Sequence, residues 1–225
     1  MEKWSLSLRY GFRWLLVHLA LLFAAAIVQP AAAQPAAKAP PAPLIWALGD
    51  SLTAGYGLPP EQGFTPRLQA ALRRAGVAAT VRNGGVAGDT AAQARARLRW
   101  GLRGLGVTPV LVIVELGAND MLRGLPVAQA KANLDAILTE LKRRRIPVLL
   151  AGMRAAPNLG PDYVRAFEAM YPALARAHGV PLYPFFLDGV AGNRRLLQAD
   201  GLHPTARGVE IMVARILPSV RRALR

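Results

Sequence analysis

The stretch LIWALGDSLTAGYGL, residues 44–58, organises the chain, because its apolar run stops abruptly at Gly49-Asp50-Ser51. Such a run is typical of a buried strand that ends in a turn. A serine at that point lies at the carboxyl edge of a parallel sheet, where open α/β proteins place their ligands. The same residues also fit a plain turn in which Asp50 or Ser51 caps the next helix. The stretch predicts a strand and leaves both roles of Ser51 open.

Apolar runs of strand type alternate with segments of helical composition along the chain. The runs lie at 44–48, 77–81, 109–115, 147–151 and 180–183. The helical segments lie at 66–75, 91–105, 127–145, 162–178 and 205–224. This alternation predicts an α/β fold with a five-stranded parallel sheet and helices on both faces.

The amino-terminal residues have the three parts of a secretory signal peptide. Basic residues precede a largely apolar run at 14–28, and Ala31-Ala32-Ala33 offers small residues for cleavage before Gln34. The apolar run is too short to span a bilayer comfortably. We therefore expect residues 1–33 to be removed on export to the periplasm or the medium, with an uncleaved membrane anchor as the alternative. Because the chain has no cysteine, disulfides and a lipid anchor on cysteine are excluded.

Residues 34–43, QPAAKAPPAP, have neither hydrophobic period nor core-forming side chains. They predict a stiff, extended Pro/Ala-rich linker. Residues 44–225 then form one domain, long enough for a substantial core.

The chain carries a formal charge of +15, and the residues before Gln34 contribute a net +2 of it. A strong positive charge suits nucleic acid or an anionic membrane surface. The arginines are spread along the predicted helices, as at Arg95, Arg97, Arg99 and 143–145, which favours a solvated face. No basic run is interleaved with aromatic residues, and export argues against nucleic acid as the partner. Transient contact with an anionic membrane surface stays open.

A glycine-rich segment, NGGVAGDT at 83–90, follows the second predicted strand. Its spacing matches neither the dinucleotide fingerprint nor the P-loop, and no lysine follows, so it predicts no cofactor site. We expect a turn whose backbone N–H groups are open to an approaching oxygen, with that of Gly88 beside Ser51.

The third predicted strand ends at GAND, residues 117–120. Asn119 is thereby delivered to the same edge as Ser51, with an amide that can donate to a developing oxyanion. An ordinary Asn-Asp turn explains the same residues equally well.

The segment DGLHP at 200–204 precedes the last predicted helix. Its spacing lets the Asp200 carboxylate reach Nδ1–H of His203 while Nε2 faces outward, as a general base requires. The alternative is a turn at Asp200 and a helix start at His203. Of the other two histidines, His18 lies in the signal segment and His178 on a predicted helix, so His203 is the one histidine expected in a loop.

Four segments together resemble the ordered blocks of the SGNH (GDSL-type) hydrolases: GDSL at 49–52, Gly88, GAND at 117–120 and DGLH at 200–203. The nearer likeness is to the periplasmic thioesterase I, lysophospholipase L1 and arylesterase group, and it extends from Leu44 to the end of the chain. The resemblance implies a flavodoxin-like three-layer αβα sandwich. It also implies hydrolysis of carboxylic ester or thioester bonds of acyl substrates, with no metal and no cofactor.

The resemblance further implies a role for each motif residue. Ser51 is the nucleophile, His203 the base and Asp200 its orienting partner. The N–H groups of Ser51 and Gly88 form the oxyanion hole with the side chain of Asn119. The loop MRAAPNLG at 153–160 corresponds to a substrate-contacting loop of the group but has lost bulk, which leaves the preferred acyl chain length open.

Three other functions need comparison with this one. A metallophosphoesterase requires several His and Asp ligands, and only His178 and His203 follow the signal segment. A non-catalytic binding domain of the same fold is disfavoured because all the motif residues are present. An acetyl-carbohydrate esterase would use the same mechanism. Because specificity lies in loops such as 121–126 and 153–160, the acyl donor does not follow from the sequence, nor does the oligomeric state.

Overall fold

A computed structural model describes residues 42–225, and it contains the predicted five-stranded parallel sheet. The expected signal peptide and all but the last two residues of the expected linker lie outside the described residues. The strands pair in the order β2-β1-β3-β4-β5, which is the flavodoxin-like order and confirms the predicted fold class. Their bounds are β1 Leu44–Gly49, β2 Thr80–Gly85, β3 Leu111–Glu115, β4 Val148–Ala151 and β5 Leu182–Tyr183.

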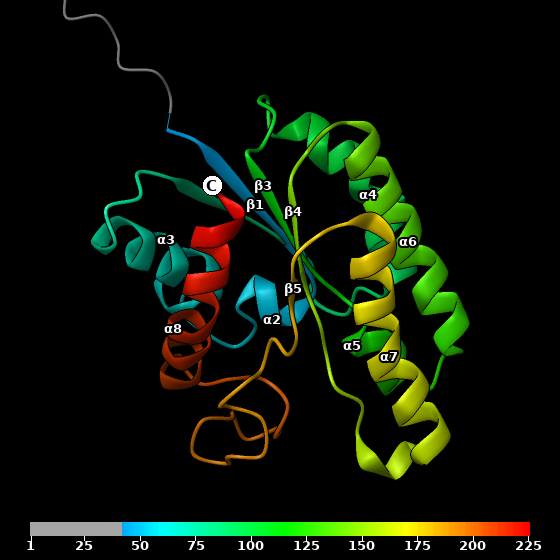
Figure 1. Ribbon diagram of the computed structural model, residues 1–225. Helices are drawn as coiled ribbons and strands as arrows, with labels where there is room; N and C mark the ends of the chain where they lie inside the picture. Colours follow the sequence, from blue (N-terminus) through cyan, green and yellow to red (C-terminus); the bar gives the residue numbers. More distant parts are fainter. Residues whose placement is uncertain (1–41) are drawn as a thin grey trace, which may run out of the picture. The chain divides into compact units, whose positions relative to one another are not determined.

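Helices cover both faces of the sheet, so the domain has three layers (Figure 1). On one face α3 (Phe64–Arg74) packs against α8 (Ala206–Ala223). On the other face α6 (Val127–Arg143) lies between α4 (Ala91–Gly104) and α7 (Pro161–His178). Short α2 (Ser51–Ala54) and α5 (Ala118–Leu122) follow β1 and β3, and 3₁₀ turns form at Pro60–Gln62 and Pro157–Leu159. Within residues 42–225, no helix is long and apolar enough to cross a membrane.

The three central strands are buried along their whole length because helices shield them on both sides. The helices bury apolar stripes at intervals of three and four residues, as α6 does with Leu134, Ile137, Leu138 and Leu141. The core thus holds the sheet between the two helical layers and keeps the carboxyl ends of β1 and β3 side by side.

The second strand differs from the prediction. It was expected at 77–81 with a glycine turn from residue 83, but β2 continues to Gly85 and pairs with β1 to its end. A Cβ at Gly84 would lie 2.1 Å from Nε1 of Trp46, and one at Gly85 would lie 2.3 Å from the backbone nitrogen of Ala54. The glycines therefore serve close packing inside a strand, and the turn begins only after them.

Candidate active site

Ser51 is the first residue of α2, directly after β1. Asp50 caps this short helix, because its Oδ1 accepts a hydrogen bond from the N–H of Leu52 at 3.0 Å. Gly49 allows the tight exit from the strand, since a Cβ there would lie 2.1 Å from Oγ1 of Thr53. Of the two roles considered for this turn, Asp50 takes the cap, which leaves the Ser51 hydroxyl directed into a cleft.

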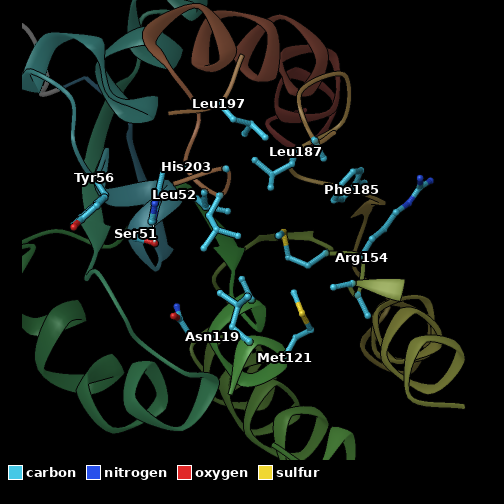
Figure 2. Close-up of a pocket in the computed structure, with 18 of the residues that line it drawn as sticks. Ser51, Leu52, Tyr56, Asn119, Met121, Arg154, Phe185, Leu187, Leu197 and His203 are labelled. Atoms are coloured by element: carbon cyan, nitrogen blue, oxygen red, sulfur yellow. Dashed lines mark hydrogen bonds between the residues drawn. The ribbon is translucent and has the colours of Figure 1, made fainter. Parts of the chain in front are cut away.

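The loop that precedes α8 contains Asp200 and His203, and it brings His203 to Ser51 (Figure 2). Nε2 of His203 lies 2.9 Å from Oγ of Ser51, and Nδ1 lies 2.6 Å from Oδ2 of Asp200. The other carboxylate oxygen of Asp200 accepts from the N–H groups of Leu202 and His203 at 2.9 and 3.0 Å. These backbone donors, with the imidazole, lower the pKa of Asp200 to about 2. Asp200 is therefore a carboxylate at any working pH and holds the imidazole by Nδ1–H.

Two residues that the sequence did not single out hold this loop against the serine segment. Nε2 of Gln198 donates to the backbone oxygens of Tyr56 at 2.8 Å and Pro204 at 3.0 Å. The ring of Tyr56 packs on the His203 imidazole with centroids 4.5 Å apart. Tyr56 and Gln198 are 142 positions apart, so no local pattern could have paired them.

Three predicted oxyanion donors lie along one wall of the same cleft: Ser51, Gly88 and Asn119. Among residues 42–225 the backbone N–H groups of Ser51 and Gly88 have no hydrogen-bond acceptor. Gly88 has a φ of +84°, a left-handed conformation that favours glycine. Both N–H groups are thus available to an incoming oxygen.

The side-chain amide of Asn119 already has hydrogen-bond acceptors within the protein. Asn119 lies in α5, and its Nδ2 donates to Oδ2 of Asp50 at 3.1 Å and to the backbone oxygen of Asp89 at 3.0 Å. An amide NH₂ has two hydrogens, so both are engaged within the protein. An oxyanion would have to replace or share one of these acceptors.

Arg97 and Arg123 support the turn that contains Gly88. Nε of Arg97 pairs with Oδ2 of Asp89 at 2.5 Å, and its Nη2 donates to the backbone oxygen of Gly49 at 3.0 Å. Nη2 of Arg123 donates to the backbone oxygen of Gly88 at 2.7 Å. The sequence placed Arg97 on a solvated face, and that was wrong: its side chain is 21% exposed and links the serine turn to the glycine turn.

Two buried carboxyl groups lie directly beneath the site. Burial raises the pKa of Asp50 to about 6, although the N–H of Leu52, the nearby His203 and the Asn119 amide act in the opposite direction. Burial, and then the charge of Asp50, raise the pKa of Glu115 well above its ordinary value. Oγ1 of Thr53 donates to one Glu115 oxygen at 2.7 Å, and the other oxygen has no partner among the described residues. This pair makes the floor beneath Ser51 sensitive to pH.

The cleft at Ser51 has a volume of about 630 Å³ and a mostly apolar lining. In Figure 2, Ser51 and His203 lie at one end and Phe185 and Arg154 at the other. The two loops named from the sequence contribute Met121 and Leu122 from one and residues 153–156 from the other. The sequence missed the third wall, which consists of Phe185, Leu187, Leu197 and Leu202 from the segment before α8. Such a cleft suits an apolar chain attached to a group that Ser51 can attack.

A metallophosphoesterase would need a cluster of metal-ligating side chains. Within the described part of the chain, no group of three or more His, Asp or Glu side chains is arranged to hold a metal ion. Nε2 of His178 lies 2.7 Å from Oδ1 of Asp135, away from the cleft.

Comparisons with known proteins give the family to which the chain is similar. A family model described as "GDSL-like Lipase/Acylhydrolase family" matches residues 47–211. "Esterase TesA" of Pseudomonas aeruginosa is 38% identical over 174 residues, which cover 77% of this chain and 86% of the relative. "Thioesterase 1/protease 1/lysophospholipase L1" of Escherichia coli K12 is 37% identical over 193 residues, covering 86% and 85%. The crystal structure of AlinE4, titled an SGNH-hydrolase family esterase, superposes with a TM-score of 0.71 at 48% identity, covering 84% of this chain and 100% of that one.

Proposed function

Because this chain belongs to the GDSL-like lipase/acylhydrolase family and is an ester hydrolase, we propose that Ser51 attacks the carbonyl of acyl esters or thioesters. One observation carries the proposal. Ser51, His203 and Asp200 form a continuous chain of hydrogen bonds at the mouth of an apolar cleft. This is the arrangement that activates a serine for nucleophilic attack.

In the first half of the reaction, Nε2 of His203 takes the hydroxyl proton as Oγ of Ser51 bonds to the carbonyl carbon. The electron pair of the C=O bond moves onto the oxygen, and the resulting tetrahedral adduct collapses when its bond to the leaving alcohol or thiol breaks. The imidazolium returns its proton to that leaving group. Water then attacks the acyl carbon while His203 takes one of its protons, the bond from that carbon to Oγ of Ser51 breaks, the proton passes from Nε2 to Oγ, and the carboxylic acid leaves. Asp200 stays ionised throughout and stabilises the imidazolium.

The oxyanion is stabilised first by the two free backbone donors, the N–H groups of Ser51 and Gly88. Asn119 joins them by turning one N–H from the Asp89 backbone oxygen, 3.0 Å away, towards the developing charge. A full negative charge is a stronger acceptor than a carbonyl, so this exchange is favoured only once the carbon has become tetrahedral. The contact with Asp50 keeps the amide in place meanwhile.

The apolar cleft favours substrates with a hydrophobic acyl chain. The names of the relatives, an esterase and a thioesterase with lysophospholipase activity, span the leaving groups we propose. An acetyl-carbohydrate esterase is the second candidate by mechanism. Its substrate would leave most of the apolar lining unused, so the observation favours longer acyl groups.

A fluorophosphonate probe tests the nucleophile. The chain has two serines within the described residues, Ser51 and Ser219, and Ser219 on α8 accepts a hydrogen bond from Arg222 far from the cleft. We expect Ser51→Ala to abolish labelling and hydrolysis together and Ser219→Ala to change neither. Labelling that survives Ser51→Ala refutes the assignment.

A substrate series tests the acyl preference. Nitrophenyl esters from acetate to dodecanoate, acyl thioesters and lysophospholipids are compared by kcat/KM. The proposal expects medium or long acyl chains to exceed acetate. Fast cleavage of acetylated sugars with slow cleavage of longer esters would favour the second candidate.

A further inference from the structure

Large apolar side chains are exposed in two groups on the described domain. Tyr56, Leu122 and Leu202 line the catalytic cleft, and Val86 lies next to its rim, so the substrate site accounts for these four. Trp100, Val107 and Val110 form the second group, and the proposed reaction does not use them. Trp100 is 72% exposed, the highest value among these seven side chains.

The second group lies at the amino-terminal edge of the sheet, opposite the catalytic edge. Trp100 is in the last turns of α4, and Val107 and Val110 belong to the connection from α4 to β3. The N–H of Val110 donates to the backbone oxygen of Leu44 at 2.8 Å, so the patch adjoins the point where the chain enters β1.

Several arginines lie at the same ends of α4 and α6, which pack side by side (Figure 1). A cleft of about 560 Å³ between the ends of the two helices is lined by Arg103, Arg143 and Arg144, and Val107 lines it as well. One carboxylate, Glu140, lies between the arginines at 3.0 Å from Arg143 and 2.8 Å from Arg144. Arg99 approaches the same carboxylate at 3.4 Å, so three guanidinium groups share one negative charge. The surface therefore keeps a strong positive excess.

We propose that this surface, the Trp100 patch (Trp100, Val107, Val110, Arg103, Arg143 and Arg144), docks the protein on an anionic phospholipid bilayer. Tryptophan prefers the level of the lipid headgroups because its ring is apolar and its N–H is polar. The two valines add apolar area beside it, and arginine binds phosphate in a planar, bidentate manner. Exposed aromatic and aliphatic side chains beside a cluster of arginines are complementary to anionic headgroups above an acyl layer.

Nucleic acid fits the patch less well. Stacking would use Trp100, but the two exposed valines would gain nothing from a sugar-phosphate backbone. Docking through the Trp100 patch also leaves the catalytic cleft accessible, since the cleft lies at the opposite edge of the sheet. Docking there would place the enzyme at a membrane surface without changing its reaction, whichever acyl group is cleaved.

Site-specific labelling can test the proposal on the full chain. Because the natural sequence has no cysteine, Val107→Cys gives one attachment point for an environment-sensitive fluorophore inside the patch. Ala214→Cys on α8 is exposed on the other face of the sheet and serves as the matched control. The labelled protein is titrated with vesicles of equal parts phosphatidylglycerol and phosphatidylcholine, and separately with vesicles of phosphatidylcholine alone. The readout is local, so membrane binding through residues 1–41 alone would leave the Val107 label unchanged.

We expect the Val107 label to brighten several-fold with the anionic vesicles only, and the Ala214 label to stay unchanged. Replacing Arg103, Arg143 and Arg144 by Gln should raise the half-saturating lipid concentration about 10- to 100-fold, since each basic residue near an anionic surface contributes about 5-fold. Replacing Arg73, Arg176 and Arg195 by Gln removes the same charge from other exposed positions and should have a much smaller effect. Ester hydrolysis by both triple variants verifies that they are folded.

Several results would overturn the proposal. These are a silent Val107 label, equal responses of the two labels, an equal response to neutral vesicles, or equal losses in the two triple variants. A short single-stranded oligonucleotide that shifts the Val107 label at the same concentration of phosphate as the lipid would show a general polyanion surface instead.

Discussion

Asp50→Asn should change how the stability of the protein depends on pH. Burial raises the pKa of Asp50 from its ordinary 3.8 to about 6 in the folded protein. Below pH 3.8 the group is protonated in both the folded and the unfolded state and does not affect stability. Between pH 3.8 and about 6 the unfolded chain ionises first, so folding becomes less favourable as the pH rises. Above pH 6 the loss is complete.

The size of this loss follows from the two pKa values. At about 1.36 kcal/mol per pH unit, the folded state loses about 3 kcal/mol by pH 7. Asn cannot titrate, so the variant escapes this loss. Its single amide oxygen can accept from the N–H of Leu52 or from the Asn119 amide but not from both, so one of these hydrogen bonds is lost at a constant cost of about 1 to 3 kcal/mol. The free energy of unfolding of the variant, relative to the natural protein, should therefore rise by about 2 to 3 kcal/mol from pH 4 to pH 7.

Urea unfolding followed by circular dichroism at pH 4, 5, 6 and 7 measures this difference. Asp162→Asn is the control, because the Asp162 side chain is 90% exposed on α7 and its replacement removes one negative charge without changing a buried group. The burial of Glu115 is common to both proteins and cancels, whereas the part of its raised pKa that comes from the charge of Asp50 is lost in the variant and acts in the same direction. A flat or falling difference for Asp50→Asn would show that Leu52, Asn119 and His203 outweigh burial and that Asp50 is ionised throughout.

The remaining predictions concern the reaction, the floor of the site and the ends of the chain. Asn119→Ala should lower kcat about 10²- to 10³-fold with little change in KM. Asn119→Asp should lower kcat at least as much, because a carboxylate would face the oxyanion. A folded Asn119→Ala enzyme with nearly full kcat would contradict the proposed exchange of hydrogen bonds at Asn119. Glu115→Gln should raise the melting temperature at pH 7 more than at pH 4. The variant removes the free-energy cost of keeping a buried carboxyl protonated and still offers an acceptor to Thr53. An equal rise at both pH values would show that the pKa of Glu115 is not raised. Hydrolysis should survive exhaustive chelation, and recovery of lost activity on addition of a divalent ion would count against the serine mechanism. Amino-terminal sequencing of the exported protein should start at Gln34, and a start well before it would favour the uncleaved anchor.

Much of the fold could be predicted because its signals are local. Apolar runs and helical segments alternate along the chain. Strands β3 and β4 are buried on both faces, so each is a continuous apolar run that composition alone can identify. The second strand was misplaced because glycine is depleted in strands and common in turns. What keeps Gly84 and Gly85 in β2 is the close packing of Trp46 and Ala54, which no local rule contains.

In the candidate site, too, the residues within short motifs could be predicted and their distant supports could not. Ser51, Asn119, Asp200 and His203 could be named because each follows a strand or precedes a helix within a short motif. The supports of these residues could not, since each connects distant parts of the chain. Arg97 bonds to Gly49 across 48 positions, and its exposure could be judged only after β1, β2 and α4 had been assembled. The occupied amide of Asn119 also depends on Asp50 and Asp89 arriving from two other loops.

The hydrogen bond between His203 and Ser51 joins residues 152 positions apart, one after the first strand and the other just before the last helix. A growing chain therefore contains the proposed nucleophile long before the proposed base. Because the loop with His203 leads directly into α8, which packs on α3, we expect hydrolysis only once this packing has formed. A chain that stops before Asp200 keeps a serine with no more reactivity than any other alcohol. We therefore expect turnover of a chromogenic ester to report complete folding of this domain.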